Sequence, residues 1–177
     1  MLRLYEEAGD VQTNSSYPIE IERMAHEVCQ KLVSQICIKS DGDVFHQLFR
    51  QKPHKISGMC PDKVKACELH QGQWGTVGSV ICWSYFHDGK ERVAKEIIEA
   101  IDEENKSVTF NVIEGDLMEQ FKVMKLIVHV DTKGEDNLVT WTLQYQKLNK
   151  DVADPHSLMD FCLHVTKDIE THHITPA

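Results

Sequence analysis

The sequence predicts an α+β fold in which an antiparallel sheet packs against one long helix near the C-terminal end. Three features indicate this class. Several segments alternate apolar and polar residues with a period of two, short turn sequences separate those segments, and an amphipathic segment with helical spacing closes the chain. Such alternation is typical of strands with one covered face, and strands that are segregated from helices favour an antiparallel sheet.

Residues 1–24 differ from the rest of the chain. They are polar, show no clear periodicity and contain the sequence Ser15-Ser16-Tyr17-Pro18. A segment of this composition cannot bury enough apolar surface to become ordered. We therefore expect a disordered N-terminal extension, or an alternative start, followed by a single domain over residues 25–177.

A first strand and two short helices are predicted next. Residues 28–39 are rich in Val, Leu and Ile, as expected for a strand. In the segment 40–43, Asp side chains can accept hydrogen bonds from the free N–H groups of a helix over residues 43–51. Prolines interrupt the chain beyond it and leave room for a second short helix near residues 55–60.

Five further segments are predicted as strands from their alternation and from the turns between them. His87-Asp88-Gly89-Lys90 is a hairpin turn sequence, and residues 132–137 form another turn. In the later strands the alternation places apolar side chains on one face. The predicted strands cover residues 63–70, 79–86, 107–114, 122–130 and 138–148.

Residues 91–101 give a different signal. Their apolar residues have helical spacing and lie among strong helix formers, so this pattern alone favours a helix. The residues that set the spacing are Val93, Ala94, Ile97, Ile98 and Ile101.

The C-terminal segment predicts the long helix. Asp154 can cap its N-terminus, and Pro155 occupies the first helical position. About 18 residues at 1.5 Å each give a helix roughly 27 Å long, which must bury its apolar stripe on the inner face of the sheet. The stripe consists of Leu158, Phe161, Cys162, Val165 and Ile169.

Composition limits the classes of function. The 177-residue chain has 41% hydrophobic residues and a formal net charge of −9, and no apolar stretch approaches the ~20 residues that span a bilayer. Nucleic-acid binding is disfavoured because a basic stripe is needed to neutralise phosphates. No pattern typical of a secretory signal precedes the domain, so we expect a cytoplasmic protein whose six cysteines remain reduced.

No cofactor and no metal site are predicted. The ten histidines show no metal-ligand spacing beside a carboxylate or a thiol. Gly72, Gly75 and Gly78 resemble a phosphate-binding loop, but a strand-like segment follows them and the Gly-Lys-Ser/Thr ending of a Walker loop is missing. We therefore predict a shaped turn with Trp74 packed on the surface.

Several longer motifs occur together, in order and at fixed separations. They are Gly72-Gln73-Trp74-Gly75-Thr76-Val77-Gly78-Ser79-Val80, Asp88-Gly89-Lys90, Glu99-Ala100-Ile101-Asp102-Glu103, Val112-Ile113-Glu114-Gly115-Asp116-Leu117-Met118-Glu119, Asp131-Thr132-Lys133-Gly134-Glu135 and Lys167-Asp168-Ile169-Glu170. Over residues 28–174 the chain resembles the major latex protein family, a plant branch of the birch pollen allergen superfamily, and especially its kirola-like members.

The resemblance implies a helix-grip fold. In that fold a curved, seven-stranded antiparallel sheet surrounds the long C-terminal helix, and two short helices lie under one end. The resemblance therefore implies a strand at residues 91–101 and a glycine-rich loop between two strands. It also implies an internal hydrophobic cavity that accepts small apolar or amphipathic molecules.

The candidate ligand-binding residues lie on the apolar faces of the predicted strands and helix. Glu114 is expected on the same face as Phe110 and Val112, and the hydroxyl of Tyr145 is a second candidate for orienting a polar group. From the alternation alone these residues can equally form a solid core. The full set is Phe110, Val112, Glu114, Met124, Leu126, Val139, Trp141, Leu143, Tyr145, Phe161 and Val165.

The resemblance implies non-catalytic binding, transport or sensing of a small hydrophobic molecule such as a steroid, phenolic or hormone-like metabolite, linked to defence or stress. A monomer or weak dimer is expected. An enzyme of alkaloid-type metabolism is the first alternative, with Glu114, Asp116 and Lys122 as candidate acid–base groups, although their spacing suggests no poised pair. A ribonuclease is the weaker alternative, because the chain is acidic.

Overall fold

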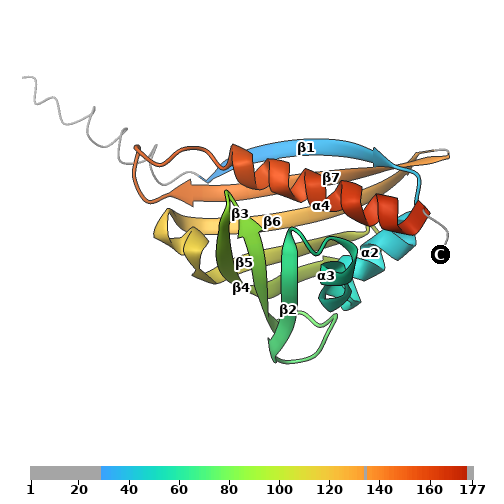
Figure 1. The fold of residues 1–177 in the computed structure, drawn as a ribbon, viewed down its shortest axis with the longest axis horizontal. Helices are drawn as coiled ribbons and strands as arrows, with labels where there is room; N and C mark the ends of the chain where they lie inside the picture. The colour runs from blue at the N-terminus through green and yellow to red at the C-terminus, as the bar shows by residue number, and fades with distance from the viewer. Residues whose placement is uncertain (1–28, 134, 175–177) are drawn as a thin grey trace, which may run out of the picture.

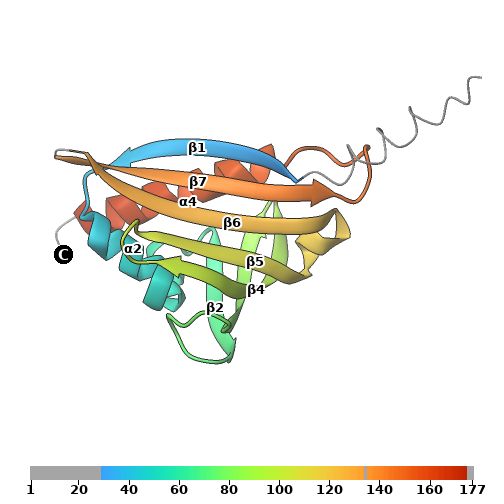
Figure 2. The same cartoon turned by 180° about the vertical axis from the view of Figure 1, so that it is seen from behind.

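The computed structural model describes residues 29–133 and 135–174. The predicted N-terminal extension, residues 1–24, lies outside the described residues. Figure 1 shows a curved sheet with one long helix across its inner face, and Figure 2 shows the same sheet from its outer side. The predicted helix-grip α+β architecture is confirmed.

The sheet has seven strands in the order β1-β7-β6-β5-β4-β3-β2, and every neighbouring pair is antiparallel. Consecutive strands are therefore neighbours, except that β1 pairs with the last strand in the chain. The strands are β1 (Gln30–Ile38), β2 (Val64–Gln71), β3 (Val80–His87), β4 (Lys90–Asp102), β5 (Ser107–Gly115), β6 (Phe121–Lys133) and β7 (Asp136–Lys147).

The short helices α2 (Gly42–Gln51) and α3 (Ile56–Met59) lie together at one end of the sheet (Figure 1). A 3-10 turn, η1 (Pro53–Lys55), joins them. The Asp41 carboxylate caps α2, because it accepts hydrogen bonds from Asp43 N at 2.8 Å and Val44 N at 3.1 Å. This cap is the one that the sequence predicts.

The long helix α4 (His156–Ile174) begins one residue later than predicted. The Asp154 carboxylate contacts Lys147 Nζ at 3.1 Å. It also accepts a hydrogen bond from the Tyr145 hydroxyl, because the loop before α4 crosses the end of β7. The carboxylate therefore ties this loop to the sheet, whereas the sequence predicts that it caps the helix.

Strand β4 explains why its sequence resembles a helix. Ala94, Glu96 and Ile98 alternate along its inner face, but the pairing with β5 then shifts between Ile98 and Ala100. Glu99 is the extra residue of this bulge, so Ile101 returns to the inner side opposite Val108. A bulge inside a strand thus gives apolar residues a helix-like spacing. The helical pattern is misleading, and the strand implied by the resemblance is confirmed.

The inner faces of the strands meet α2 and α4 in one hydrophobic core. Trp141 of β7 connects these layers: its ring packs edge-on against Phe49 of α2, with centroids 5.3 Å apart. Its Nε1 donates a hydrogen bond to Thr166 Oγ1 of α4 at 2.9 Å. The apolar faces predicted for β6 and β7 are buried here.

The glycine-rich segment connects β2 to β3, and Gly72, Gly75 and Gly78 all have positive φ. Ser79 Oγ donates to Gln73 O at 2.8 Å and accepts from Gln73 N at 3.0 Å, which fixes the loop from within. The ring of Trp74 contacts the ring of His54, with centroids 4.7 Å apart. The segment is therefore an internally hydrogen-bonded turn.

Candidate ligand-binding cavity

A cavity of about 80 Å³ lies between the inner face of the sheet and α4. Phe110, Leu126 and Trp141 form its wall on the sheet, and Leu158, Phe161 and Val165 form its wall on the helix. Phe49 of α2 and Ile56 of α3 close the cavity at the end where the two short helices lie. The walls are almost entirely apolar because each strand directs every second side chain inward.

Glu96 of β4 carries the only carboxyl group among the described residues that line this cavity. Its side chain is buried, with 5% of the residue exposed. Its Oε2 accepts a hydrogen bond from Trp83 Nε1 at 2.8 Å. Burial raises the pKa of this carboxyl to about 8, and the bond from Trp83 opposes the rise only in part. At neutral pH most copies of Glu96 are therefore uncharged.

The polar groups around Glu96 are also uncharged at neutral pH. Burial raises the pKa of the Tyr85 hydroxyl and of the Cys67 and Cys162 thiols, and the charge that Glu96 can carry raises each of them further. Tyr85 comes from β3, Cys67 from β2 and Cys162 from α4. The interior therefore combines an apolar surface with a few neutral hydrogen-bonding groups.

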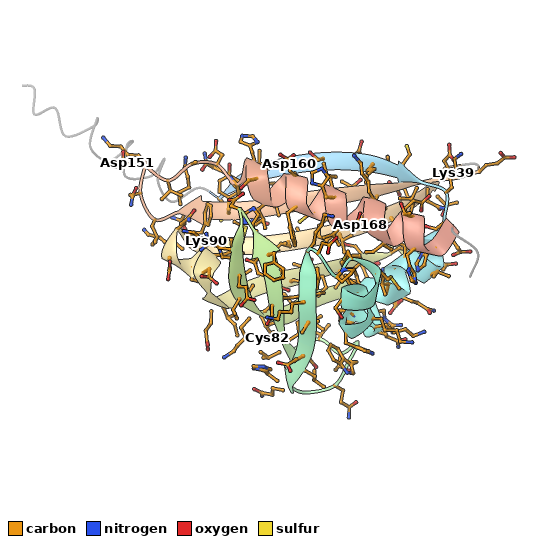
Figure 3. The ribbon with its side chains drawn as sticks, in the orientation of Figure 1. Lys39, Cys82, Lys90, Asp151, Asp160 and Asp168 are labelled. Carbon is orange, nitrogen blue, oxygen red and sulfur yellow. The ribbon has the colours of Figure 1, made fainter. Side chains whose placement is uncertain are left out.

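A second pocket, of about 220 Å³, lies beside the inner cavity, and we call it the mouth. It is polar, with His87, Asp88, Arg92, Asp116 and Asp154 in its wall. Figure 3 shows Lys90, the first residue of β4, and Asp151, in the loop before α4, at this end of the molecule, with Lys39 at the other. The mouth therefore opens at the end remote from α2 and α3.

The mouth and the inner cavity are adjacent, because Tyr85, Leu117 and Leu158 line both. The ring of Phe161 packs between the two spaces, with its centroid 5.4 Å from that of Tyr85 and 5.8 Å from that of His87. These side chains form the partition between the mouth and the inner cavity.

Comparison with known proteins shows to which family this chain belongs. Residues 27–175 match the model of the pathogenesis-related protein Bet v 1 family. The chain belongs to the Bet v 1 family. Within it, the chain groups with the major latex proteins, as the sequence motifs predict.

Among solved Bet v 1 family structures, ginseng major latex-like protein 151 from Panax ginseng is 56% identical, with a TM-score of 0.82, and the match covers 84% of this chain and 99% of that one. MLP-like protein 28 of Arabidopsis thaliana is 42% identical over 93% of this chain, which spans 50% of that relative's length. A Thalictrum norcoclaurine synthase mutant, at 13% identity and a TM-score of 0.65 over 84% of this chain and 98% of that one, shares the fold.

In this Bet v 1 family chain, the predicted site residues fall into three groups. One group lines the inner cavity: Phe110, Leu126, Trp141, Phe161 and Val165. A second group is buried in the core around it: Val112, Met124, Val139, Leu143 and Tyr145. Glu114 forms the third by itself. Contact between any of these residues and a ligand stays a prediction.

Glu114 lies on the outer face of the sheet, so its predicted place beside Phe110 and Val112 is wrong. It pairs with Lys95 of β4, and its carboxylate contacts Lys95 Nζ at 2.6 Å. The cause is a second bulge in this family member. Glu96 opposes Val112 and Lys95 opposes Glu114, so the extra residue Ile113 reverses the alternation of β5.

Tyr145 is directed toward the loop before α4. Burial and, after it, the hydrogen bond to the Asp154 carboxylate raise the pKa of its hydroxyl to about 12. Its ring packs edge-on against Phe121, with centroids 5.8 Å apart. The hydroxyl therefore fixes the mouth of the Bet v 1 scaffold, and it does not face the inner cavity.

Sequence reasoning missed Glu96. Once residues 91–101 are treated as a strand, Glu96 falls between Ala94 and Ile98 on the inner face, and a carboxyl among such neighbours is the signal that could have found it. In residues 29–133 and 135–174, no group of three His, Cys, Asp or Glu side chains could hold a metal ion. No helix in these ranges is long and apolar enough to cross a membrane.

Proposed function

We propose that this chain binds a small hydrophobic molecule in its inner cavity and acts without catalysis, as a carrier or sensor of plant metabolites in the cytoplasm. The observation that carries the proposal is the apolar cavity next to a polar mouth, with shared walls between them. Membership of a pathogenesis-related family, in which small hydrophobic ligands are bound, supports both the activity and a role in defence.

The cavity's size sets what the protein must do to accept a ligand. Its volume of about 80 Å³ is smaller than the roughly 150 Å³ that holds benzene in an engineered cavity. A two-ring molecule must therefore displace the partition side chains and extend toward the mouth. Burial of about 300 Å² of apolar surface would contribute on the order of 7 kcal/mol before entropy losses, which allows micromolar affinity.

Fluorescence of the hydrophobic dye N-phenyl-1-naphthylamine tests the proposal. We expect saturable, single-site enhancement with the wild-type chain. Val165→Phe fills the cavity and should weaken binding at least tenfold, whereas Val33→Phe places the same ring on an exposed position of β1 and should leave binding unchanged. Absence of saturable binding in the wild type would reject the proposal, and so would equal binding by the two variants.

An enzyme is the second candidate, and Glu96 is the observation that favours it. A buried carboxyl with a pKa of about 8 can act as a general acid near neutral pH. The groups suggested by the sequence do not assemble around it. Glu114 lies on the outer face, Lys122 is exposed, and Asp116 contacts Arg92 at 3.5 Å in the mouth. Turnover of a bound ligand that Glu96→Gln abolishes would favour this candidate over the carrier.

A further inference from the structure

We infer that Glu96 is the residue that recognises the ligand's polar group, and that the cavity selects an apolar molecule carrying an uncharged hydrogen-bond acceptor such as a ketone or ester carbonyl. This inference rests on the proposed function and adds the polar chemistry of the ligand.

The geometry around Glu96 shows which of its two carboxyl oxygens is left without a hydrogen-bond partner. The Trp83 indole N–H is a donor only, and it occupies Oε2. In a neutral carboxyl whose Oε2 accepts this bond, the proton resides on Oε1. In the described part of the chain, no side chain or backbone group forms a hydrogen bond with Oε1. An O–H group is therefore left for a molecule in the cavity.

A donor without a protein partner beside the cavity lacks a hydrogen bond that it would make in water, and a ligand acceptor placed against it would restore that bond. The neighbouring cavity residues leave room for an apolar body and offer few competing partners. Ala94 and Ile98 flank Glu96 on β4, and Val112 lies opposite it on β5. The ligand's acceptor is thus expected at Glu96, with its hydrocarbon part toward Phe110 and Trp141.

Burial holds the pKa of Glu96 high, and the groups that face it from other elements do not reverse this effect. They are Trp83 and Tyr85 of β3, Cys67 of β2 and Cys162 of α4, and none of them is a cation. Cys82 of β3, further away, interacts only weakly and has a raised pKa because of burial. The nearest lysine in sequence, Lys95, is directed to the outer face and paired with Glu114. No described residue therefore supplies a countercharge inside the cavity.

A neutral carboxyl distinguishes ligands by their charge. It does so only while the pH keeps Glu96 protonated. It donates to a carbonyl, whereas a carboxylate ligand would bring a second acidic group into a dry cavity. As the pH rises through about 8, Glu96 ionises and its donor is lost. Preference for a carbonyl ligand should therefore be present at pH 6.5 and disappear at pH 9.5.

The experiment uses two probes of matched shape, 2-acetylnaphthalene and 2-isopropylnaphthalene, whose dissociation constants are measured by quenching of tryptophan fluorescence. The preference is the ratio of the hydrocarbon's constant to the ketone's. Glu96→Met removes the carboxyl at similar volume and supplies the reference ratio. We expect the wild-type ratio to exceed that reference about tenfold at pH 6.5, as one hydrogen bond provides.

Glu96→Gln is the matched conservative variant, because its amide keeps an acceptor for Trp83 and a donor for the ligand without titrating. It should retain the preference at both pH values, whereas the wild type loses it at pH 9.5. Equal ratios for wild type and Glu96→Met at pH 6.5 would overturn the inference, as would a wild-type preference that persists at pH 9.5. In both cases the probes still bind, so the carrier proposal stands; if neither probe binds the wild type, that proposal fails instead.

Discussion

Trp83 and Glu96 form a diagonal pair across two neighbouring strands on the inner face of the sheet. Trp83 of β3 lies opposite Ala94, and Glu96 of β4 lies opposite Ile81, yet the indole Nε1 donates to Glu96 Oε2 at 2.8 Å. Residues at diagonal positions on neighbouring strands are about 7–8 Å apart, a distance that a long aromatic side chain can bridge. This bond fixes the one carboxyl group that lines the cavity wall in the described part of the chain.

Glu96 should make the protein less stable as the pH rises. Its folded-state pKa of about 8 exceeds the ordinary value of 4.5, so the folded state holds a proton that the unfolded state has lost. The stabilisation is complete below the unfolded pKa and is lost as the pH rises through the folded pKa. The free energy of unfolding should therefore fall between about pH 5 and 8, by at most about 1.4 kcal/mol per pH unit from this group.

Urea unfolding of the wild type and of Glu96→Gln across this range measures the effect as the difference between the two curves. Glu114→Gln, on the outer face, is the control and should run parallel to the wild type. If the free energy of unfolding of the wild type and of Glu96→Gln changed in parallel with pH, Glu96 would have the same pKa in the folded and the unfolded state, and the prediction would be wrong.

Thr166→Val should destabilise the protein by about 1–3 kcal/mol. Thr166 is fully buried, accepts the bond from Trp141 Nε1 and donates to Cys162 O at 2.9 Å, so valine leaves the indole N–H without its acceptor. Thr171→Val is the matched control, because Thr171 makes the same bond to a carbonyl four residues earlier but is exposed. In chemical denaturation, Thr171→Val should lower the free energy of unfolding by less than about 0.5 kcal/mol. Equal decreases for the two variants would contradict the role of Thr166 as the buried acceptor for Trp141.

Gly115→Ala should cost about 2–4 kcal/mol. Gly115 has a φ of 114°, and a Cβ there would collide with the carbonyl oxygen of Val93 on β4. Gly58→Ala provides the contrast, since a Cβ at this position in α3 meets nothing within 4 Å and alanine favours a helix. Unfolding midpoints should move in opposite directions. A Gly115→Ala protein as stable as the wild type would show that the end of β5 can rearrange.

Glu170→Gln should destabilise the junction between β1 and α2. The Glu170 carboxylate of α4 accepts from Lys39 N at 2.6 Å, and from Ser40 N at 3.1 Å and Ser40 Oγ at 2.5 Å. Burial alone would raise its pKa, but these hydrogen bonds outweigh burial and lower the pKa below its ordinary value. Bonds to a charged group contribute about 1.5–3 kcal/mol each, less where water has access.

The effect of pH on stability is opposite for Glu170 and Glu96. The stabilisation by Glu170 is present above its unfolded pKa and is lost as the pH falls through its folded pKa. Acid unfolding followed by circular dichroism should therefore begin at a higher pH when Glu170 is replaced. Unchanged acid and urea transitions in Glu170→Gln would refute this account.

The sequence predicted the elements whose signals are local and regular. Alternation along residues 122–130 and 138–148 identified β6 and β7, and the stripe from Leu158 to Ile169 identified α4. The capping position of Asp41 was likewise recognisable, because it depends on neighbours two and three residues away.

The two bulges in the pairing of β4 with β5 explain what could not be predicted. One produced the helix-like spacing around Glu99, and the other turned Glu114 outward. A bulge is decided by pairing between strands, so alternation within a single strand does not reveal it. The burial of Glu96 depends on partners from β2, β3 and α4, which the sequence separates by many residues.

The pairing of β1 with β7 has a consequence for biosynthesis. Gln30 lies opposite Tyr145, so the first strand finds its hydrogen-bonding neighbour only after more than a hundred further residues have been made. Until then its edge is unpaired while the chain leaves the ribosome, and long-range pairing of this kind slows folding. Closure of the sheet is therefore expected late in folding, and chains cut short before β7 would be exposed to aggregation through that edge.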